Sequence, residues 1–332
     1  MTTATTAPVT GLPATRSVLA AELDSHSLRV IRAIADRGSI TAAATSLGYS
    51  QPAVSQTVRR LEERLGMPVL TRAARGVRLT EAGEVLARHA ATVLRAMDSA
   101  ADELAELSGL RSGLVRIAAF PSASSTVVPR LLGGITKRRP GVRFSYLEAE
   151  PPEAVQAVRD HTADLALTFS YPGDPDDPHR ASATGLVSVP LWREDMLLLV
   201  PDAHGLADGP IDLASLRDAG WIAGCPRCRG HLVELCETSG FTPALNYETD
   251  NSQAVISMVA AGLGVALLPS LALATTPLPA GVTTRRPASG DSRTVHLVTA
   301  QGATRVPAIG ATIDAIRSLD AACWGLAAVT AG

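Results

Sequence analysis

Several residue types and sequence features are scarce in this chain of 332 residues. Aromatic residues make up 3% of it, and lysine occurs once, at Lys137, so almost every basic residue is an arginine. No apolar run reaches the roughly 20 residues of a membrane-spanning helix. Residues 1–22 lack the basic and apolar segments of a secretion signal and resemble a flexible tail. We therefore expect a cytoplasmic protein with no membrane partner.

Cysteine is scarce as well, since the chain has four: Cys225, Cys228, Cys236 and Cys323. Without an export signal, this number indicates a reducing compartment and no structural disulfide framework. Three of them lie with His231 in the stretch CPRCRGHLVELC, where the histidine spacing matches no common zinc finger. We expect no metal and no cofactor. Three interpretations of Cys225 and Cys228 stay open: helix packing beside a ligand, a thiol redox switch, and metal sensing.

The motifs of common enzyme classes are missing too. The chain has no Gly-x-Ser-x-Gly, no His-Glu-x-x-His, no Walker loop and no Gly-x-Gly-x-x-Gly that opens a helix. Its composition is 46% hydrophobic and 19% charged, with a mean hydropathy of +0.17, as in globular proteins. The length is sufficient for two or more domains. We therefore expect a multidomain globular protein that is not an enzyme.

Three short helices are predicted one after another in residues 23–66. The segments 27–38 and 39–48 each carry apolar residues on one face and end at a glycine. Ser39 and Ser50 are placed to cap the second and third helices, and Pro52 falls in the first turn of the third, where no backbone N–H is needed. The third helix has one apolar stripe, formed by Val54, Val58, Leu61 and Leu65.

The opposite side of this third helix offers amides, hydroxyls and a guanidinium. Glutamine can bond adenine, arginine can bond guanine, and serine adapts to either, so this side suits the major groove of DNA. Two helices joined by a tight turn that contains glycine form a helix-turn-helix pattern. Charge supports it, because residues 23–80 carry nine arginines against four acidic residues, a net charge of +5 on a chain whose total is −2.

Two further elements follow the three helices. Residues 69–72 and 77–79 are predicted strands of a wing, whose Arg72, Arg75 and Arg78 would reach phosphates or the minor groove. Residues 80–107 are predicted to form one long helix with a heptad seam, typical of a helix that pairs with its copy in a second subunit. Packing of the seam on its own chain is the alternative. The seam consists of Leu86, Ala90, Val93, Met97, Ala100, Leu104 and Leu107.

Residues 112–320 alternate predicted strands and helices, which favours an α/β fold with mainly parallel strands. Strands are expected at 113–120, 142–150, 163–170, 194–201, 221–224 and 265–269, and helices at 151–161, 231–240 and 254–264. Ligands of such folds bind beyond the carboxyl ends of the strands. Three polar segments, which we expect to be loops, meet that condition: 120–126, 168–172 and 249–253.

The stretch from Gly38 to Gly83, with SQPAVSQ, then RLEERLG and R-x-x-R-x-x-x-L-T-x-A-G, resembles the winged helix-turn-helix of LysR-type transcriptional regulators. Leu70 stands where that family usually has phenylalanine, a difference in core packing. The resemblance continues more weakly to about residue 320. It implies an α+β multidomain fold with a winged helix-turn-helix at 23–80 and a linker and dimerisation helix at 81–110. A two-lobed α/β effector domain, similar to a periplasmic solute-binding protein, would follow at 112–320, with lobe I at about 112–193 and 290–320 and lobe II at about 194–289.

The resemblance also implies two sets of site residues. The expected DNA-binding residues are Ser39, Thr41, Ser50, Gln51, Pro52, Ser55, Gln56, Arg59, Arg72 and Arg75. The expected effector-binding residues are Ser122, Ser124, Ser125, Thr126, Thr168, Phe169, Cys225, Asp250 and Asn251.

Together these features predict a LysR-type regulator that binds an inverted-repeat operator as a homodimer, or as a homotetramer made of two dimers. A small-molecule effector would bind in the C-terminal cleft, and RNA polymerase is a further expected partner. Two alternatives stay open. The same regulator would be switched by thiol redox or metal at Cys225 and Cys228, or a solute-binding or enzymatic domain would carry a vestigial helix-turn-helix.

Overall fold

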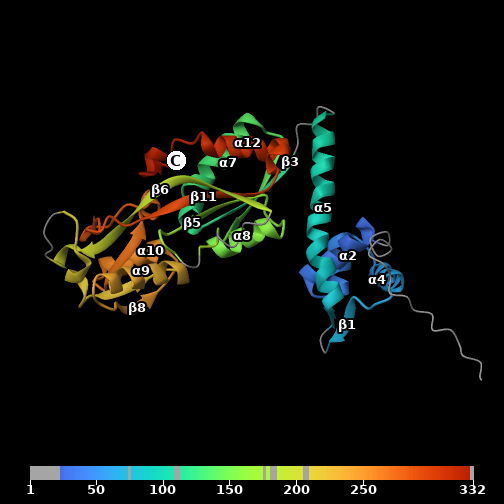
Figure 1. Ribbon diagram of the computed structural model, residues 1–332, viewed down its shortest axis with the longest axis horizontal. Coiled ribbons are helices and arrows are strands. Elements are labelled where there is room, and N and C mark those ends of the chain that lie inside the picture. The colour runs from blue at the N-terminus through green and yellow to red at the C-terminus, as the bar shows by residue number, and fades with distance from the viewer. Residues whose placement is uncertain are drawn as a thin grey trace, which may run out of the picture. The chain divides into compact units, whose positions relative to one another are not determined.

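The computed structural model describes residues 23–73, 76–107, 113–174, 177–179, 185–204 and 209–329 (Figure 1). The chain divides into two compact units, the first ending at Ala100 and the second beginning at Ala101. None of the helices in these described ranges is long and apolar enough to cross a membrane.

The first unit contains three short helices, a two-stranded wing and the start of a long helix. Its elements are α2 (Ser25–Arg37), α3 (Ile40–Leu47), α4 (Gln51–Leu65), β1 (Leu70–Ala73), β2 (Gly76–Leu79) and α5 (Glu81–Leu107). The strands β1 and β2 pair in antiparallel fashion. The predicted helices and wing are therefore confirmed, with the first strand shifted by one residue to begin at Leu70.

The ends of α2 and α3 and the starts of α3 and α4 follow from the local sequence. The Ser39 hydroxyl accepts a hydrogen bond from the Ala42 N–H at 3.1 Å, and Ser50 accepts one from Ala53 at 3.4 Å. Gly38 and Gly48 end α2 and α3 with φ angles of 69° and 71°. Glycine adopts this left-handed conformation without steric cost, so the turn before α4 is specified by these few residues.

The apolar stripe of α4 forms the core of the first unit. Val54, Val58, Leu61 and Leu65 are all buried and pack with residues of α2 that include Ile31. Because packing uses this side of α4, its opposite side is left for other contacts. The Glu62 carboxylate joins α4 to the wing by accepting hydrogen bonds from the backbone N–H groups of Val69 and Leu70, at 2.9 and 3.1 Å.

Helix α5 begins against the wing and then exposes its seam. At Gly83 a Cβ atom would lie 2.2 Å from the carbonyl oxygen of Val69, so this close approach requires glycine. Ala90 is buried, but farther along the seam Val93, Met97 and Leu104 have exposed fractions of 43, 44 and 64%. A row of exposed apolar side chains at heptad spacing is typical of a helix that lacks its partner.

The second unit is a mixed sheet with helices on its faces. Its strands are β3 (Gly113–Ala119), β4 (Val142–Glu148), β5 (Leu165–Ser170), β6 (Leu186–Pro201), β7 (Gly220–Ala223), β8 (Ala244–Glu248), β9 (Val265–Pro269), β10 (Val282–Arg285), β11 (Ser292–Ala300) and β12 (Ala327–Ala328). Its α-helices are α6 (Pro121–Ser124), α7 (Val127–Arg138), α8 (Pro151–Arg159), α9 (Pro226–Thr238), α10 (Ser252–Ala260), α11 (Ser270–Leu273) and α12 (Pro307–Arg317). Short 3-10 helices lie at Asp202–His204, Leu213–Leu216, Ala303–Arg305 and Ala321–Trp324.

The strand order β4-β3-β5-β11-β6-β9-β7-β8 divides this sheet into two lobes. The first part of β6 pairs with β11 up to Asp195, and its continuation from Met196 pairs with β9. The chain therefore crosses from lobe I, built on β3, β4 and β5, to lobe II, built on β7, β8 and β9, within one strand.

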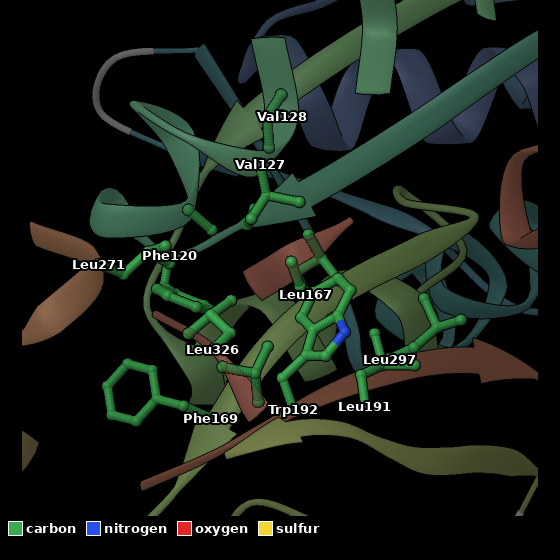
Figure 2. Close-up of a cluster of buried hydrophobic side chains, with 14 of the residues drawn as sticks. Phe120, Val127, Val128, Leu167, Phe169, Leu191, Trp192, Leu271, Leu297 and Leu326 are labelled. Atoms are coloured by element: carbon green, nitrogen blue, oxygen red, sulfur yellow. The ribbon is translucent and has the colours of Figure 1, made fainter. Parts of the chain in front are cut away.

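Side-chain alternation along the strands builds a core on each face of the sheet. In lobe I, residues of β5 such as Leu167 and Phe169 face α7 and α12, and the intervening Ala166 faces α8. Figure 2 shows Phe120, Leu167, Phe169 and Leu297 within the larger of these clusters. In lobe II, α10 covers one face through Ile256 and α9 covers the other. Lobe I is therefore a three-layer arrangement, as the α/β pattern predicted.

Three expectations about this unit are corrected. The strands around β3 and β7 are parallel, but β6 and β11 run antiparallel to their neighbours because they carry the chain between the lobes. Of the segments expected to be loops, 121–124 form the short helix α6 and 168–170 belong to strand β5. Helix α9 begins at Pro226, five residues before the predicted start, because Cys225 caps it and proline fits its first turn.

We expect the exposed seam of α5 to hold two copies of the chain together. The substitution Met97→Glu places a carboxylate in that seam in both copies, and it should raise the dimer dissociation constant at least about tenfold. Analytical ultracentrifugation measures this change. Thr92→Glu, at an exposed position on another side of α5, is the matched control and should leave the mass unchanged. If both variants sediment with the same mass, the seam does not hold the two copies together.

Candidate functional site

The first candidate surface is the side of α4 opposite its buried stripe. Gln51, Pro52, Gln56 and Arg59 are exposed there, and Ser55 is half-buried between them. The Gln51 amide donates a hydrogen bond to the Ser55 hydroxyl at 2.9 Å, which orients both groups on the helix surface. The first turn of α4 has no acidic residue. Exposed donors without competing carboxylates suit contact with base edges and phosphates.

The other expected DNA-binding residues lie around this helix. The hydroxyls of Ser39 and Ser50 cap α3 and α4, while Thr41 is exposed in the first turn of α3. The backbone of Arg72 lies in β1. The side chain of Arg72 and the whole of Arg75 lie outside the described residues.

The second candidate site is a cleft between the two lobes, at the carboxyl ends of the strands where such folds bind ligands. Lobe I contributes the ends of β3 and β5 and the start of α8, while lobe II contributes the starts of α9 and α10 and the end of β9. The lining residues are Phe120, Pro121, Ser122, Glu150, Phe169, Met196, Gly224, Cys225, Cys228, Thr249, Asp250, Ser252, Val255, Leu267, Leu268, Pro269, Ala272 and Arg293.

A buried ion pair lies at this cleft. Arg293 of β11 and Glu194 of β6 are direct partners in the antiparallel register, and their exposed fractions are 3 and 0%. The Arg293 Nε donates to Glu194 Oε2 at 2.7 Å, and the Leu271 N–H donates to Oε1 at 2.6 Å. Arg293 Nη2 also donates to the Ser122 hydroxyl at 2.7 Å. Burial opposes its charge, but the Glu194 carboxylate raises the pKa of Arg293 above its usual value.

Two aromatic rings cover the guanidinium. The rings of Phe120 and Phe169 meet edge to face at 5.2 Å, and the Arg293 Cζ lies 4.8 and 4.2 Å from their centroids. Such cation–π contacts strengthen as water is removed. The charge of Arg293 is therefore held in one place, with hydrogen bonds and aromatic faces fixing its orientation.

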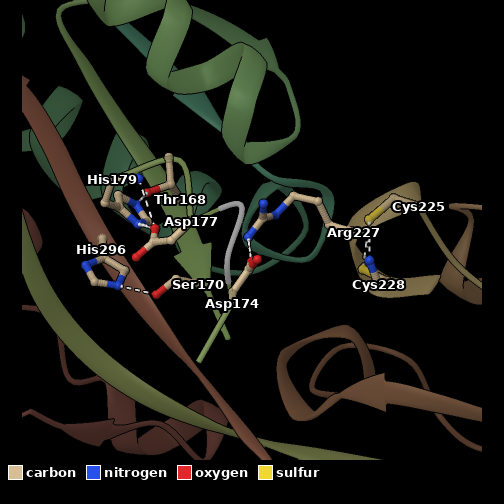
Figure 3. Close-up of polar contacts among 9 residues, drawn as sticks. All are labelled: Thr168, Ser170, Asp174, Asp177, His179, Cys225, Arg227, Cys228 and His296. Atoms are coloured by element: carbon tan, nitrogen blue, oxygen red, sulfur yellow. Dashed lines mark hydrogen bonds and ion pairs between the residues drawn. The ribbon is translucent and has the colours of Figure 1, made fainter. Parts of the chain in front are cut away.

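The start of α9 brings two thiols to the same cleft. Cys225 Sγ donates to Cys228 Sγ at 2.8 Å, and Arg227 between them forms an ion pair with Asp174 of lobe I (Figure 3). Glu150 lies across from them at the start of α8. Burial raises the pKa of Glu150, although the nearby Cys225 thiol and the charge of Arg293 oppose that rise.

The structure brings four of the nine expected effector residues to the cleft: Ser122, Phe169, Cys225 and Asp250. The others have different contacts. Ser124 bonds to Tyr146, while Ser125 and Thr126 both donate to the Ser122 carbonyl. Asn251 caps α10 by accepting from the Ala254 N–H at 3.1 Å.

Thr168 belongs to a separate polar cluster on the other face of β5 (Figure 3). Its hydroxyl lies 2.7 Å from His179 Nε2, and His179 Nδ1 lies 2.6 Å from an Asp177 oxygen. The ring of His179 stacks on His296 at 4.0 Å, and His296 Nε2 lies 2.9 Å from the Ser170 hydroxyl. Burial, with a smaller effect of His179, lowers the pKa of His296 to about 4, so the His296 ring is neutral at physiological pH. Burial also lowers the pKa of His179, although Asp177 opposes that shift.

Sequence reasoning missed Arg293, Glu194 and Glu150. The sequence did carry a signal for the first two. Arg293 is two and four residues from Val295 and Leu297, and Glu194 is two residues from both Trp192 and Met196, so each charged residue shares a strand face with large apolar residues. A charged residue at an inward-facing strand position requires a partner of opposite charge. What the sequence did not state is that these two strands pair with each other in this register.

Comparison with known families gives two matches that together cover most of the chain. The family model described as the bacterial regulatory helix-turn-helix protein of the lysR family matches residues 25–84. The model described as the LysR substrate binding domain matches residues 108–321.

Among curated proteins, the probable HTH-type transcriptional regulator LrrA of Synechococcus elongatus is 30% identical over 292 residues, covering 87% of this chain and 95% of that protein. A probable hydrogen peroxide-inducible genes activator of Mycobacterium avium is 30% identical over 253 residues, covering 74% and 78%. Among solved structures, a full-length OxyR variant from Pseudomonas aeruginosa matches with a TM-score of 0.68 at 24% identity, covering 90% and 96%. Full-length CbnR in complex with its target DNA matches with a TM-score of 0.61 at 21% identity, covering 89% and 99%.

Removing one member of the buried ion pair should destabilise the second unit strongly. Glu194→Gln leaves the Arg293 charge buried without its counterion, which typically costs about 3–5 kcal/mol in the free energy of unfolding. Denaturant titration followed by tryptophan fluorescence measures this unit, because all three tryptophans of the chain, Trp192, Trp221 and Trp324, lie in it.

Arg193→Met is the matched control, since Arg193 neighbours Glu194 but is exposed, and it should change stability by less than about 0.5 kcal/mol. The double variant Glu194→Leu with Arg293→Met removes both charges, so its free energy of unfolding should fall by less than that of Glu194→Gln alone. A cost for Glu194→Gln as small as that of Arg193→Met would contradict the role given to this pair.

Proposed function

Because the chain belongs to the LysR family of bacterial helix-turn-helix regulators, we propose that it binds an operator through α4 and responds to a small molecule in the inter-lobe cleft. It is a DNA-binding transcriptional regulator with a substrate-binding effector domain. The observation that carries the residue assignment is the division of α4 into a buried apolar stripe and an exposed polar side. We place the protein in the cytoplasm, where its operator lies.

The polar side of α4 supplies the contacts with DNA. Gln51, Gln56 and Arg59 are exposed at the amino-terminal half of the helix, the part of a recognition helix that contacts base edges. The hydroxyls of Ser39 and Ser50 remain committed to capping, so their role is to position the helices and their N–H groups near phosphates. Arg72 and Arg75 of the wing provide charge toward the backbone of the duplex.

The operator is an inverted repeat bound by two copies of the chain. The exposed heptad seam of α5 supports this proposal, because two helix-turn-helix modules joined by a two-fold axis contact two half-sites. CbnR, which was solved in complex with its target DNA, has a similar fold. Assembly of two dimers into a tetramer, and contact with RNA polymerase, follow the expectation for the family.

The effector binds between the lobes. Support comes from the convergence of polar groups on one cleft: the Ser122 hydroxyl, the Asp250 carboxylate and the start of α10 at Ser252. The rings of Phe120 and Phe169 form an apolar wall beside them. A small ligand that touches both lobes favours one lobe arrangement over another, and this differential affinity is what transmits a signal.

The α4 assignment predicts a change in base preference. Gln56→Ala should weaken operator binding by about 1–3 kcal/mol while leaving binding to random duplex nearly unchanged, since base-edge bonds are lost and phosphate contacts remain. Competition gel shifts at fixed salt measure both affinities. Gln253→Ala, which removes the same amide from an exposed site on α10, should match the wild type. Equal losses on operator and random DNA would contradict direct base contact.

The cleft assignment predicts that a bulky side chain placed in the cleft prevents ligand binding. A metabolite that raises the melting temperature at about 100 times its Kd stabilises the protein by about 2.7 kcal/mol. Ser252→Phe fills the cleft and should abolish this shift. Ser257→Phe makes the same change on the exposed side of α10, outside the lining, and should preserve it. If the ligand still raises the melting temperature of Ser252→Phe but not that of Ser257→Phe, the ligand does not bind in this cleft.

A further inference from the structure

Two free thiols stand in contact at the cleft. Cys225 and Cys228 are unbonded cysteines, and their Sγ atoms lie 2.8 Å apart at the start of α9. Cys225 caps the helix and Cys228 follows one turn later, so the helix itself holds both side chains on the same side. Both line the cleft. Bond formation between sulfurs already in contact requires a small side-chain adjustment and no movement of distant backbone.

The two thiols are chemically different. A hydrogen bond from Cys225 lowers the pKa of Cys228 against the effect of burial, and the charge of Arg293 and the Tyr171 hydroxyl lower it further. The same hydrogen bond, together with burial, raises the pKa of Cys225. Of the two thiols, Cys228 is therefore the one whose deprotonation is favoured. The thiolate is the nucleophilic form of cysteine, and Cys228 is also the less buried of the two residues.

We propose that Cys225 and Cys228 form a dithiol–disulfide switch in the cleft, with Cys228 as the nucleophile and a small hydroperoxide as the oxidant. The Cys228 thiolate attacks the hydroperoxide, an S–O bond forms, the O–O bond breaks, and the leaving alkoxide takes a proton from water. Cys225 then attacks the Cys228 sulfenic acid. The S–S bond forms, the S–O bond breaks, and hydroxide leaves with the Cys225 proton as water. Two thiols lose two electrons, and the hydroperoxide becomes an alcohol and water.

Oxidation acts on two contacts that join α9 to lobe I. The charge of Arg293 favours the thiolate form of Cys228, and a neutral disulfide removes that attraction. Arg227 lies between the two cysteines and forms its ion pair with Asp174, so a change in this turn of α9 shifts its position. Oxidation thereby changes the relative stability of lobe arrangements. This regulatory consequence rests on the proposed function, whereas the thiol chemistry does not.

The experiment uses the full chain, reduced and then titrated with hydrogen peroxide or cumene hydroperoxide. Intact mass should fall by two hydrogen atoms, and non-reducing peptide maps should show Cys225 linked to Cys228, reversibly with dithiothreitol. Cys225→Ser keeps a capping hydroxyl and should stop at a sulfenic acid on Cys228 that dimedone labels. Cys228→Ser should lose both reactions. Cys323→Ser removes an exposed cysteine elsewhere and should react as the wild type does.

A second measurement tests the activation of Cys228. Tyr171→Phe removes one hydroxyl and keeps the ring that stacks on His231 at 3.7 Å. Its rate of Cys228 alkylation by iodoacetamide at neutral pH should fall by up to about tenfold, with the pH–rate midpoint displaced upward. Phe144→Tyr, at a half-buried position on β4, changes one hydroxyl outside the cleft lining and should leave the rate unchanged.

The outcomes separate this inference from the proposed function. No loss of two hydrogen atoms from the intact mass at peroxide concentrations that oxidise Cys323, a disulfide between other cysteines, or dimedone labelling of Cys225 in the Cys228→Ser variant would overturn it. A chain that forms the disulfide but shows no operator preference supports the switch and overturns the proposed function. A chain that binds its operator and keeps both thiols under peroxide supports the proposed function and overturns the switch.

Discussion

The buried pair of Arg293 and Glu194 is the constraint on which the second unit depends. The two residues face each other where β6 and β11 carry the chain between the lobes. Neither charge tolerates burial alone, so both strands are held in the one register that pairs them. The remaining hydrogen bonds reach Ser122 at the start of α6 and the backbone of Leu271 at the start of α11. One ion pair thereby fixes elements from both sides of the cleft.

The same pair sets the chemistry of the cleft. Phe120 and Phe169 exclude water from the guanidinium, and electrostatic effects are stronger where water is excluded. Glu194 lies behind Arg293, while Cys228 lies on its cleft side and receives part of its field. A positive charge placed there to hold two strands together also favours a thiolate. Structural and chemical roles of Arg293 are therefore inseparable, which explains why a charge occupies a position that an apolar pair would fill at less cost.

The local parts of this structure were predictable from sequence, and the non-local parts were not. Caps at Ser39 and Ser50 and the apolar stripe of α4 specify the helix-turn-helix, because those interactions span a few residues. The cleft depends on which distant strands pair, and no short pattern connects Arg293 to Glu194. Thr168 and Phe169 were assigned to one site, but adjacent strand residues face opposite sides of a sheet. Phe169 reaches the cleft and Thr168 reaches the histidine cluster.

The starts of α4 and α9 share one construction, and their difference is informative. Each helix has a capping side chain followed by proline in its first turn, at Ser50 and Pro52 in α4 and at Cys225 and Pro226 in α9. Serine is among the preferred caps and cysteine is not. The cap bond at Cys225 is a long N–H to sulfur contact of 3.4 Å. Helix capping alone would be served better by a hydroxyl, so the thiol at this position is accounted for by its contact with Cys228 and with the cleft.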